Sequence, residues 1–154
     1  LADLGFMSEG RNLFIVGSTG TGKSYIATAL GYRACQKEHK VLYANTAKLM
    51  AKLKVAKAKG SILQELKKIE RTELLILDDF GLQPLDTTAR NLLMDIIEDR
   101  PGKKSTIIAS QIPVRAWYEA IADQTVADAI MDRIIHGAIK IQLKGESMRK
   151  RKNI

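Results

Sequence analysis

One segment of the sequence has the residue types and spacing of a phosphate-binding loop. It is Gly17-Ser18-Thr19-Gly20-Thr21-Gly22-Lys23-Ser24, which matches the pattern G-x-x-x-x-G-K-S/T at every fixed position. The glycines let the backbone bend so that successive N–H groups point into one concavity and bind phosphate oxygens. The pattern assigns the Lys23 ammonium to the β- and γ-phosphates and the Ser24 hydroxyl to Mg²⁺. We therefore predict a site for ATP and Mg²⁺, with Tyr25, directly after the motif, among the nucleotide-binding residues.

Two adjacent carboxylates follow an apolar run further along the chain. The run is Leu74-Leu75-Ile76-Leu77, and Asp78 and Asp79 come directly after it. Because such a run favours a strand covered on both faces, Asp78 is expected at the carboxyl end of that strand, where open α/β sheets bind ligands. We assign Asp78 to the metal side of the site and Asp79 to the attacking water, as general base.

A parallel sheet is needed to bring the loop and the two carboxylates together. Short apolar runs alternate with longer helical stretches, which predicts an α/β fold with a parallel sheet. The predicted strands are residues 12–16, 40–44, 74–78, 105–110 and 138–143. The predicted helices are residues 23–38, a helix from an N-cap at Asp86 to about Asp99, residues 113–122 and residues 125–136. In chain order, the predicted strand of residues 40–44 comes after the strand that leads into the loop and before the acidic strand. Such an intervening strand is more typical of ATP-hydrolysing NTPases than of small-molecule kinases.

Residues 48–71 are unusually basic. They hold eight Lys or Arg residues against two Glu residues, and Gly60 and Ser61 divide them into two predicted helices. The formal net charge of the chain is +8, which fits a nucleic-acid partner. One interpretation is a solvated helical face, although such faces usually mix both signs of charge. The other is contact with DNA phosphates, for which the candidates are Lys48, Lys52, Lys54, Lys57 and Lys59.

The composition of the 154 residues is that of one globular domain. No segment approaches the roughly 18 consecutive apolar residues of a membrane span. Cys35 is the one cysteine of the sequence, and no stretch has the pattern of a secretory signal. We therefore expect a reducing, cytoplasmic location. Trp117 and Tyr118 are expected to anchor a helix and not to stack on bases.

Four blocks of sequence together resemble the IstB family, the helper ATPases of bacterial insertion-sequence transposons. The blocks are residues 12–17 leading into the glycine-rich loop, 75–81, 105–113, and 132–137 followed by 143–149. This family is related to the DnaC and DnaI helicase loaders of the AAA+ class, and the resemblance covers essentially the whole chain. It implies a P-loop NTPase of the AAA+ type, a three-layer sandwich with a five-stranded parallel sheet and an ATP site at a subunit boundary.

The resemblance also implies roles for three residues outside the loop. Gln111, at the end of the fourth predicted strand, corresponds to a sensor that monitors the γ-phosphate and positions water. Arg133 corresponds to an arginine finger that enters the neighbouring subunit's site. An alternative for Arg133 is a surface arginine paired with Asp128 or Asp132. Arg149 corresponds to a second sensor at the nucleotide. The predicted catalytic residues are therefore Lys23, Asp79, Gln111 and Arg133.

The resemblance predicts slow hydrolysis and a chain that is one part of a longer protein. AAA+ sites commonly carry Glu where this chain has Asp79, and the shorter side chain holds its carboxylate farther from the water. We expect residues 1–147 to form the ATPase domain and residues 148–154 a basic tail. Neither the helical lid of many AAA+ proteins nor the N-terminal DNA- and partner-binding region of IstB proteins is expected within these residues.

The predicted function is that of a DNA-binding ATPase that depends on ATP and Mg²⁺. We expect copies of the chain to form an oligomer on duplex DNA, with the arginine finger supplied in trans, and to assist or regulate a transposase. One alternative is a helicase loader that acts on single-stranded DNA. A more distant alternative, from a different class, is a small-molecule kinase that acts as a monomer.

Overall fold

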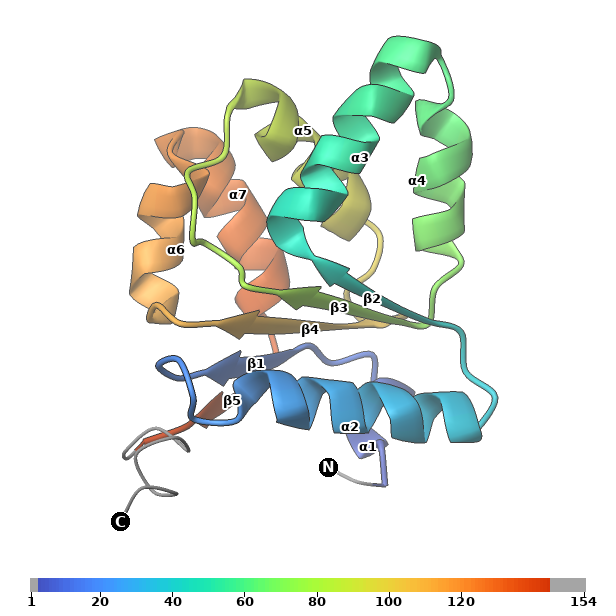
Figure 1. Ribbon diagram of the computed structural model, residues 1–154, viewed down its shortest axis with the longest axis vertical. Helices are drawn as coiled ribbons and strands as arrows, with labels where there is room; N and C mark the ends of the chain where they lie inside the picture. The colour runs from blue at the N-terminus through green and yellow to red at the C-terminus, as the bar shows by residue number, and fades with distance from the viewer. Residues whose placement is uncertain (1–2, 145–154) are drawn as a thin grey trace.

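The computed structural model describes residues 3–144, and a five-stranded parallel sheet forms its centre (Figure 1). The strands are β1 (Leu13–Val16), β2 (Val41–Asn45), β3 (Leu74–Asp78), β4 (Ser105–Ser110) and β5 (Ile139–Gln142). Their order across the sheet is β2-β3-β4-β1-β5, and every neighbouring pair is parallel. All five predicted strands are confirmed, with ends that differ from the prediction by at most one residue.

Helices cover both faces of the sheet and give the three predicted layers (Figure 1). On one face lie α1 (Gly5–Ser8) and α2 (Lys23–Gln36). On the other lie α3 (Thr46–Lys59), α4 (Ile62–Glu70), α5 (Thr87–Ile97), α6 (Val114–Ile121) and α7 (Gln124–Ile135). The sequence analysis missed α1, because a helix of four residues is too short to show a helical period. Within residues 3–144, no helix has the length and apolarity needed to cross a membrane.

A buried apolar layer on each face of the sheet holds the helices in place. Side chains alternate along β1, so that Leu13 packs with α1 and α2 whereas Phe14 packs with the helices of the opposite face. Trp117 of α6 is fully buried. Its ring meets those of Phe14 and Phe80 edge to face, at centroid distances of 4.9 and 5.1 Å. Trp117 therefore anchors α6 to the sheet, as predicted.

Arg100 is a buried cation that joins the ends of α4 and α5 to β4. Its guanidinium donates to the Oγ1 atom of Thr106 at 2.9 Å and to the backbone oxygen atoms of Ile69, Thr72 and Ser105 at 3.2, 2.9 and 2.7 Å. Burial lowers the pKa of Arg100 to about 10, so the guanidinium stays charged at neutral pH. A cation at these carbonyl groups also stabilises the C-terminal end of α4, where the helix dipole is negative.

The basic segment forms two helices that divide at Gly60, as predicted. Gly60 has a φ of 80°, the left-handed conformation in which glycine commonly ends a helix. The chain then turns back from α3 into α4. Asn45 caps the start of α3, because its Oδ1 atom accepts a hydrogen bond from the Lys48 N–H group at 3.1 Å.

Candidate nucleotide-binding site

The glycine-rich loop connects β1 to α2 at the carboxyl edge of the sheet (Figure 1). Gly20 and Gly22 have φ values of 85° and 94°, which residues with a Cβ atom rarely adopt. Gly17 is needed for space, since a Cβ atom there would lie 2.5 Å from the Thr21 Oγ1 atom. The N–H and hydroxyl groups of Thr21 both donate to the Ser18 carbonyl oxygen, at 3.2 and 2.7 Å. The loop therefore has a closed shape that depends on glycine, as a phosphate-binding backbone requires.

The sheet brings Ser24, at the start of α2, into contact with Asp78 at the end of β3. The Ser24 hydroxyl donates to the Asp78 Oδ2 atom at 2.9 Å, and Asp78 is 5% exposed. Lys23 is 6% exposed and begins α2, where the helix dipole is positive and favours bound anions. The two residues assigned to the metal therefore lie together, although β4 separates β1 from β3. Tyr25 is 79% exposed on the first turn of α2.

Asp79 follows Asp78 in a left-handed backbone conformation, with a φ of 51°. A residue other than glycine is strained there, so its surroundings must hold it in place. The Asn45 Nδ2 atom donates to the Asp79 Oδ2 atom at 3.2 Å. Because Asn45 is also the N-cap of α3, one side chain joins the start of the basic helix to the predicted general base.

Residues of β2 and α3 contribute to the site, although the sequence analysis did not identify them. The Tyr43 hydroxyl donates to the Asp78 Oδ2 atom, and the Thr46 hydroxyl donates to the Asp78 carbonyl oxygen at 2.8 Å. Partial burial of the phenol, which is 45% exposed, and its hydrogen bond to Asp78 raise the pKa of Tyr43 to about 12, so the phenol remains a donor at neutral pH. Sequence alone could have suggested Asn45 and Thr46 as site residues, because they directly follow the predicted strand of residues 40–44, at the edge of the sheet where ligands bind.

Ser110 organises the chain at the carboxyl end of β4. Its fully buried hydroxyl donates to the Phe80 carbonyl oxygen at 2.6 Å and accepts from the Ile112 N–H and Trp117 Nε1–H groups, both at 3.2 Å. Phe80 directly follows the two carboxylates, and Ile112 directly follows Gln111. One hydroxyl thus fixes the two loops that carry the predicted general base and the predicted sensor. Gln111 itself is half-buried.

Arg133 does not reach the P-loop of its own chain. The carbonyl oxygen of the next residue, Ile134, accepts a hydrogen bond from the Asn12 Nδ2 atom at 3.1 Å. Asn12 directly precedes β1, whereas the P-loop follows β1. A strand of this length spans about 13 Å, so Arg133 lies toward the opposite edge of the sheet.

The contacts of Arg133 differ from the alternative that the sequence left open. Its Nη1 atom donates to the Ala129 carbonyl oxygen at 3.0 Å, and Arg133 forms no ion pair with Asp128 or Asp132, all three being described residues. The side chain is therefore held by its own helix and not by a neighbouring carboxylate. Arg149, the predicted second sensor, lies outside the described residues.

The candidate DNA-binding lysines lie along α3, and carboxylates engage two of them. The Lys54 Nζ atom lies 2.5 Å from the Asp86 Oδ2 atom, and the Lys52 Nζ atom lies 3.8 Å from the Glu65 Oε2 atom. The exposed residues of the set are Lys48, Lys52, Lys57 and Lys59. Part of the basic charge of α3 is thus balanced within the protein.

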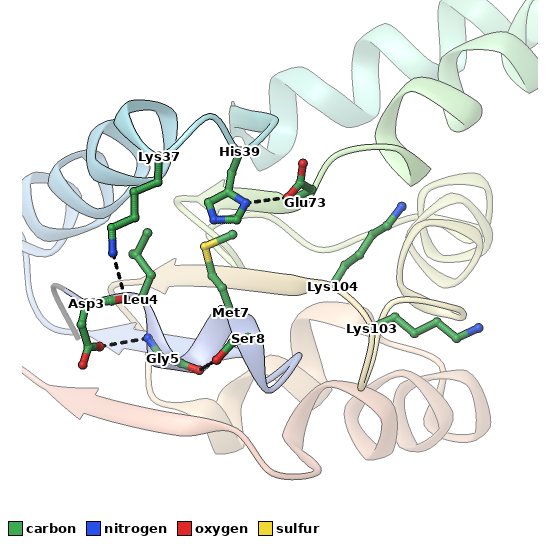
Figure 2. Close-up of a pocket in the computed structure, with 10 residues that line it drawn as sticks. All are labelled: Asp3, Leu4, Gly5, Met7, Ser8, Lys37, His39, Glu73, Lys103 and Lys104. Atoms are coloured by element: carbon green, nitrogen blue, oxygen red, sulfur yellow. Dashed lines mark hydrogen bonds and ion pairs between the residues drawn. The ribbon is translucent and has the colours of Figure 1, made fainter.

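A groove of about 480 Å³ lies beside Asp79, between α3 and residues 81–86. Another hollow, of about 330 Å³, lies at the amino edge of the sheet (Figure 2). There His39, just before β2, contacts Glu73, just before β3, with 2.6 Å between Nδ1 and Oε2. This second hollow contains none of the predicted site residues, whereas the groove beside Asp79 contains several of them.

The residues at the carboxyl edge fit ATP with Mg²⁺. Proteins commonly bind Mg²⁺ through one or two oxygen ligands together with phosphate oxygens. Among residues 3–144, no group of three or more His, Cys, Asp or Glu residues is arranged to hold a metal alone. Ser24 and Asp78, in contact beside the loop, would instead hold Mg²⁺ jointly with the nucleotide. Lys23 and the loop N–H groups would hold its phosphates.

Sequence comparison identifies the family. The family model described as IstB-like ATP binding protein matches residues 1–154, which is the whole chain. The chain belongs to this family. The IstB-like chain is 49% identical, over 90% of its length, to y4uH of Sinorhizobium fredii, which is named as an insertion sequence ATP-binding protein. It is 33% identical, over 97% of its length, to the protein of the same kind named for insertion sequence IS21 of Pseudomonas aeruginosa. The chain covers 56% of each relative, little more than half of their length.

Solved structures have the same fold as the IstB-like chain. The crystal structure of the DnaC helicase loader matches with a TM-score of 0.79 and 26% identity, over 93% of this chain and 84% of the loader. AMPPCP-bound DnaA from Aquifex aeolicus matches with a TM-score of 0.80 and 22% identity, over 98% of this chain and 48% of DnaA. The predicted AAA+ fold is confirmed, and it favours the ATPase hypotheses over the small-molecule kinase.

Proposed function

We propose that the IstB-like chain binds ATP with Mg²⁺, hydrolyses it, and assembles on duplex DNA in support of a transposase. The observation that carries the proposal is the contact between Ser24 and Asp78, beside the buried Lys23, at the edge of the sheet where the P-loop lies. The names of the insertion sequence ATP-binding relatives support the parts that concern ATP and transposition.

Each residue at this edge has a defined part in the proposed reaction. The loop N–H groups and Lys23 bind the phosphates, and Ser24 and Asp78 hold Mg²⁺, which when bound offsets phosphate charge. Asp79 accepts the proton of the attacking water, and Gln111 orients that water. We expect slow hydrolysis, because the carboxylate of Asp79 extends less far than that of the usual Glu.

We place the arginine finger in a neighbouring copy of the chain. The position of Arg133, about a strand's length from its own P-loop, supports action in trans. The contact of Ile134 with Asn12 at the amino end of β1 is the basis for that position. An arginine finger can raise the hydrolysis rate by about 10³- to 10⁵-fold. Assembly of the oligomer would therefore control the rate at which ATP is consumed.

The exposed face of α3 is the proposed DNA surface. Its lysines would contact phosphates without reading the base sequence. Because Lys52 and Lys54 already have carboxylate partners, we expect Lys48, Lys57 and Lys59 to contribute more of the affinity. Alanine at these three positions should weaken duplex binding and reduce its dependence on salt, measured by fluorescence anisotropy. Unchanged binding would remove α3 from the proposal.

A subunit-mixing experiment tests the shared ATP site. Lys23→Ala removes the phosphate-binding cation, and Arg133→Ala removes the finger, so each variant alone should hydrolyse ATP poorly on duplex DNA. An equimolar mixture should recover activity, because Arg133 of the Lys23→Ala copy can enter the intact site of the other copy. If the wild-type protein is active and the mixture recovers nothing, each site is self-contained and the proposal of a finger in trans is wrong.

The likeness to the DnaC helicase loader favours one alternative, in which the same ATPase acts on single-stranded DNA. A competition assay separates the two functions. Labelled duplex is bound in the presence of ATP and Mg²⁺ and is then challenged with unlabelled duplex or single strand of equal length. Stronger competition by duplex supports the transposition function, and stronger competition by single strand supports the loader function.

A further inference from the structure

Tyr43 approaches the metal side of the proposed nucleotide site from the edge strand of the sheet. In the parallel pairing of β2 and β3, Tyr43 lies opposite Ile76. Side chains at the paired position and two residues further along a strand share one face of the sheet, so Tyr43, Ile76 and Asp78 share a face. Ile76 packs with α2 on that face. The phenol of Tyr43 can therefore extend along the sheet toward its carboxyl edge, where its hydroxyl meets Asp78.

Three donors hold the carboxylate of Asp78. Its Oδ2 atom accepts from the Ser24 hydroxyl at 2.9 Å and from the Tyr43 hydroxyl, while its Oδ1 atom accepts from the Asp79 N–H group at 2.8 Å. Hydrogen bonds to an ionised group are stronger than those between neutral groups. Asp78 is 5% exposed, so protein groups supply most of the donors that its carboxylate can reach. The orientation of this carboxylate therefore depends on these contacts.

Of the three donors, Tyr43 is the one that neither the P-loop nor the acidic segment supplies. The Ser24 oxygen is also assigned to Mg²⁺, and the Asp79 N–H group belongs to the backbone of the predicted general base. Tyrosine has only two side-chain torsions, so a phenol holds a donor in place at a small cost in conformational entropy. Phenylalanine would fill the same space without supplying the donor.

We infer that Tyr43 is a positioning residue for Mg²⁺, because its hydroxyl holds Asp78 in the orientation in which Asp78 and Ser24 together receive the metal. The inference rests on the proposed nucleotide site and adds a residue to its metal side. A role in packing alone would change the stability of the protein but not the Mg²⁺ concentration that nucleotide binding requires.

The test compares Tyr43→Phe with Tyr32→Phe, a control at a tyrosine of α2 that is 68% exposed. A fluorescent N-methylanthraniloyl derivative of ATP is titrated in EDTA and then at rising Mg²⁺ concentrations. In EDTA, both variants should bind it within about twofold of the wild-type protein. The Mg²⁺ concentration at half-maximal tightening should rise about five- to tenfold in Tyr43→Phe, the range expected for one lost hydrogen bond from a phenol that is 45% exposed. Tyr32→Phe should match the wild type.

Further variants keep the result decisive. Asp78→Asn should abolish the Mg²⁺-dependent tightening and marks the full loss of the metal contact. Tyr43→Leu, a second variant without the hydroxyl, should show the same Mg²⁺ shift as Tyr43→Phe. If the Mg²⁺ midpoint shifts in Tyr43→Leu but not in Tyr43→Phe, the ring and not the hydroxyl is responsible, and the inference is overturned. An unchanged Mg²⁺ midpoint in folded Tyr43→Phe overturns it as well. If the wild-type protein binds no nucleotide even with Mg²⁺, the proposed nucleotide site itself is wrong, which is a different result.

Discussion

Replacing Ser110 with Ala removes one fully buried hydroxyl that holds three parts of the chain together. The hydroxyl donates to the Phe80 carbonyl oxygen at 2.6 Å and accepts from the Ile112 N–H and Trp117 Nε1–H groups at 3.2 Å. Alanine leaves the Phe80 carbonyl and the Ile112 N–H group without this partner. Trp117 is less affected, because its Nε1–H group also lies 3.2 Å from the Ile112 carbonyl oxygen.

The expected loss of unfolding free energy follows from these contacts. A buried polar group that loses its partner costs about 1–3 kcal/mol. Phe80 is 1% exposed and pays this cost in full, whereas Ile112 is half-buried and can reach some water. Together the two groups predict a loss of about 2–4 kcal/mol. This is a large share of the roughly 5–15 kcal/mol that stabilises an ordinary domain.

Urea unfolding measures this loss, and another serine of β4 provides the control. Trp117 is the only tryptophan of the chain, so its fluorescence reports unfolding beside the mutated position, and circular dichroism reports the whole fold. Ser105 is equally buried, but its hydroxyl makes one longer contact, 3.3 Å to the Phe6 carbonyl oxygen. Ser105→Ala should therefore cost only about 1 kcal/mol.

The same substitution should slow ATP hydrolysis more than it weakens nucleotide binding. Phe80 and Ile112 adjoin Asp79 and Gln111, whereas the P-loop contacts β4 through the backbone oxygen of Ser110, which alanine keeps. If Ser110→Ala unfolds within about 0.5 kcal/mol of Ser105→Ala, the reasoning from unpartnered groups is refuted.

Three further predictions concern other contacts of the structure. Asn45→Asp keeps an N-cap for α3 but replaces the donor to Asp79 with a like charge, so ATP hydrolysis should fall while helix content stays the same. Asn45→Ala removes both contacts, so hydrolysis should fall and about 1 kcal/mol of unfolding free energy should be lost as well. Equal rates in all three proteins would contradict a role for this contact. Arg100→Met should lower the unfolding free energy by about 3–5 kcal/mol, because four buried acceptors lose a donor. Arg100→Lys should recover only part of this, because an ammonium cannot bond all four acceptors. Full recovery by Lys would count against this account. The hydrogen bond from Lys54, then that from the Ala89 N–H group, hold the pKa of Asp86 below its usual value. The folded-state pKa is thus below the unfolded one, so this stabilisation is present above the unfolded pKa and is lost as pH falls through the folded pKa. Asp86→Asn should therefore flatten the loss of stability between about pH 5 and pH 3 in urea unfolding, and an unchanged slope would exclude the contact as a cause.

Much of the fold follows from patterns that lie within short segments. The P-loop is set by glycines whose left-handed or crowded backbone excludes other residues, and apolar runs such as residues 74–77 mark the strands. An N-cap at Asp86 and a helix end at Gly60 are likewise properties of a few neighbouring residues. These features were predictable because the physical cause and its effect are close together in the chain.

The partners of the site residues were not predictable in this way. The contacts of Asp78 with Tyr43 and of Asp79 with Asn45 depend on β2 lying beside β3. The pairing of Lys54 with Asp86 likewise requires α3 and α5 to pack together, and it changes one of five candidate DNA contacts into an internal ion pair.

The sequence by itself therefore determined the nucleotide loop, the strands, most of the helices and the family of this protein. The tertiary structure alone decided which side chains orient the two carboxylates and which edge of the sheet Arg133 faces. The physical reason is that periodicity and backbone sterics select each element locally, whereas the order of strands in the sheet decides which distant residues come within hydrogen-bonding distance.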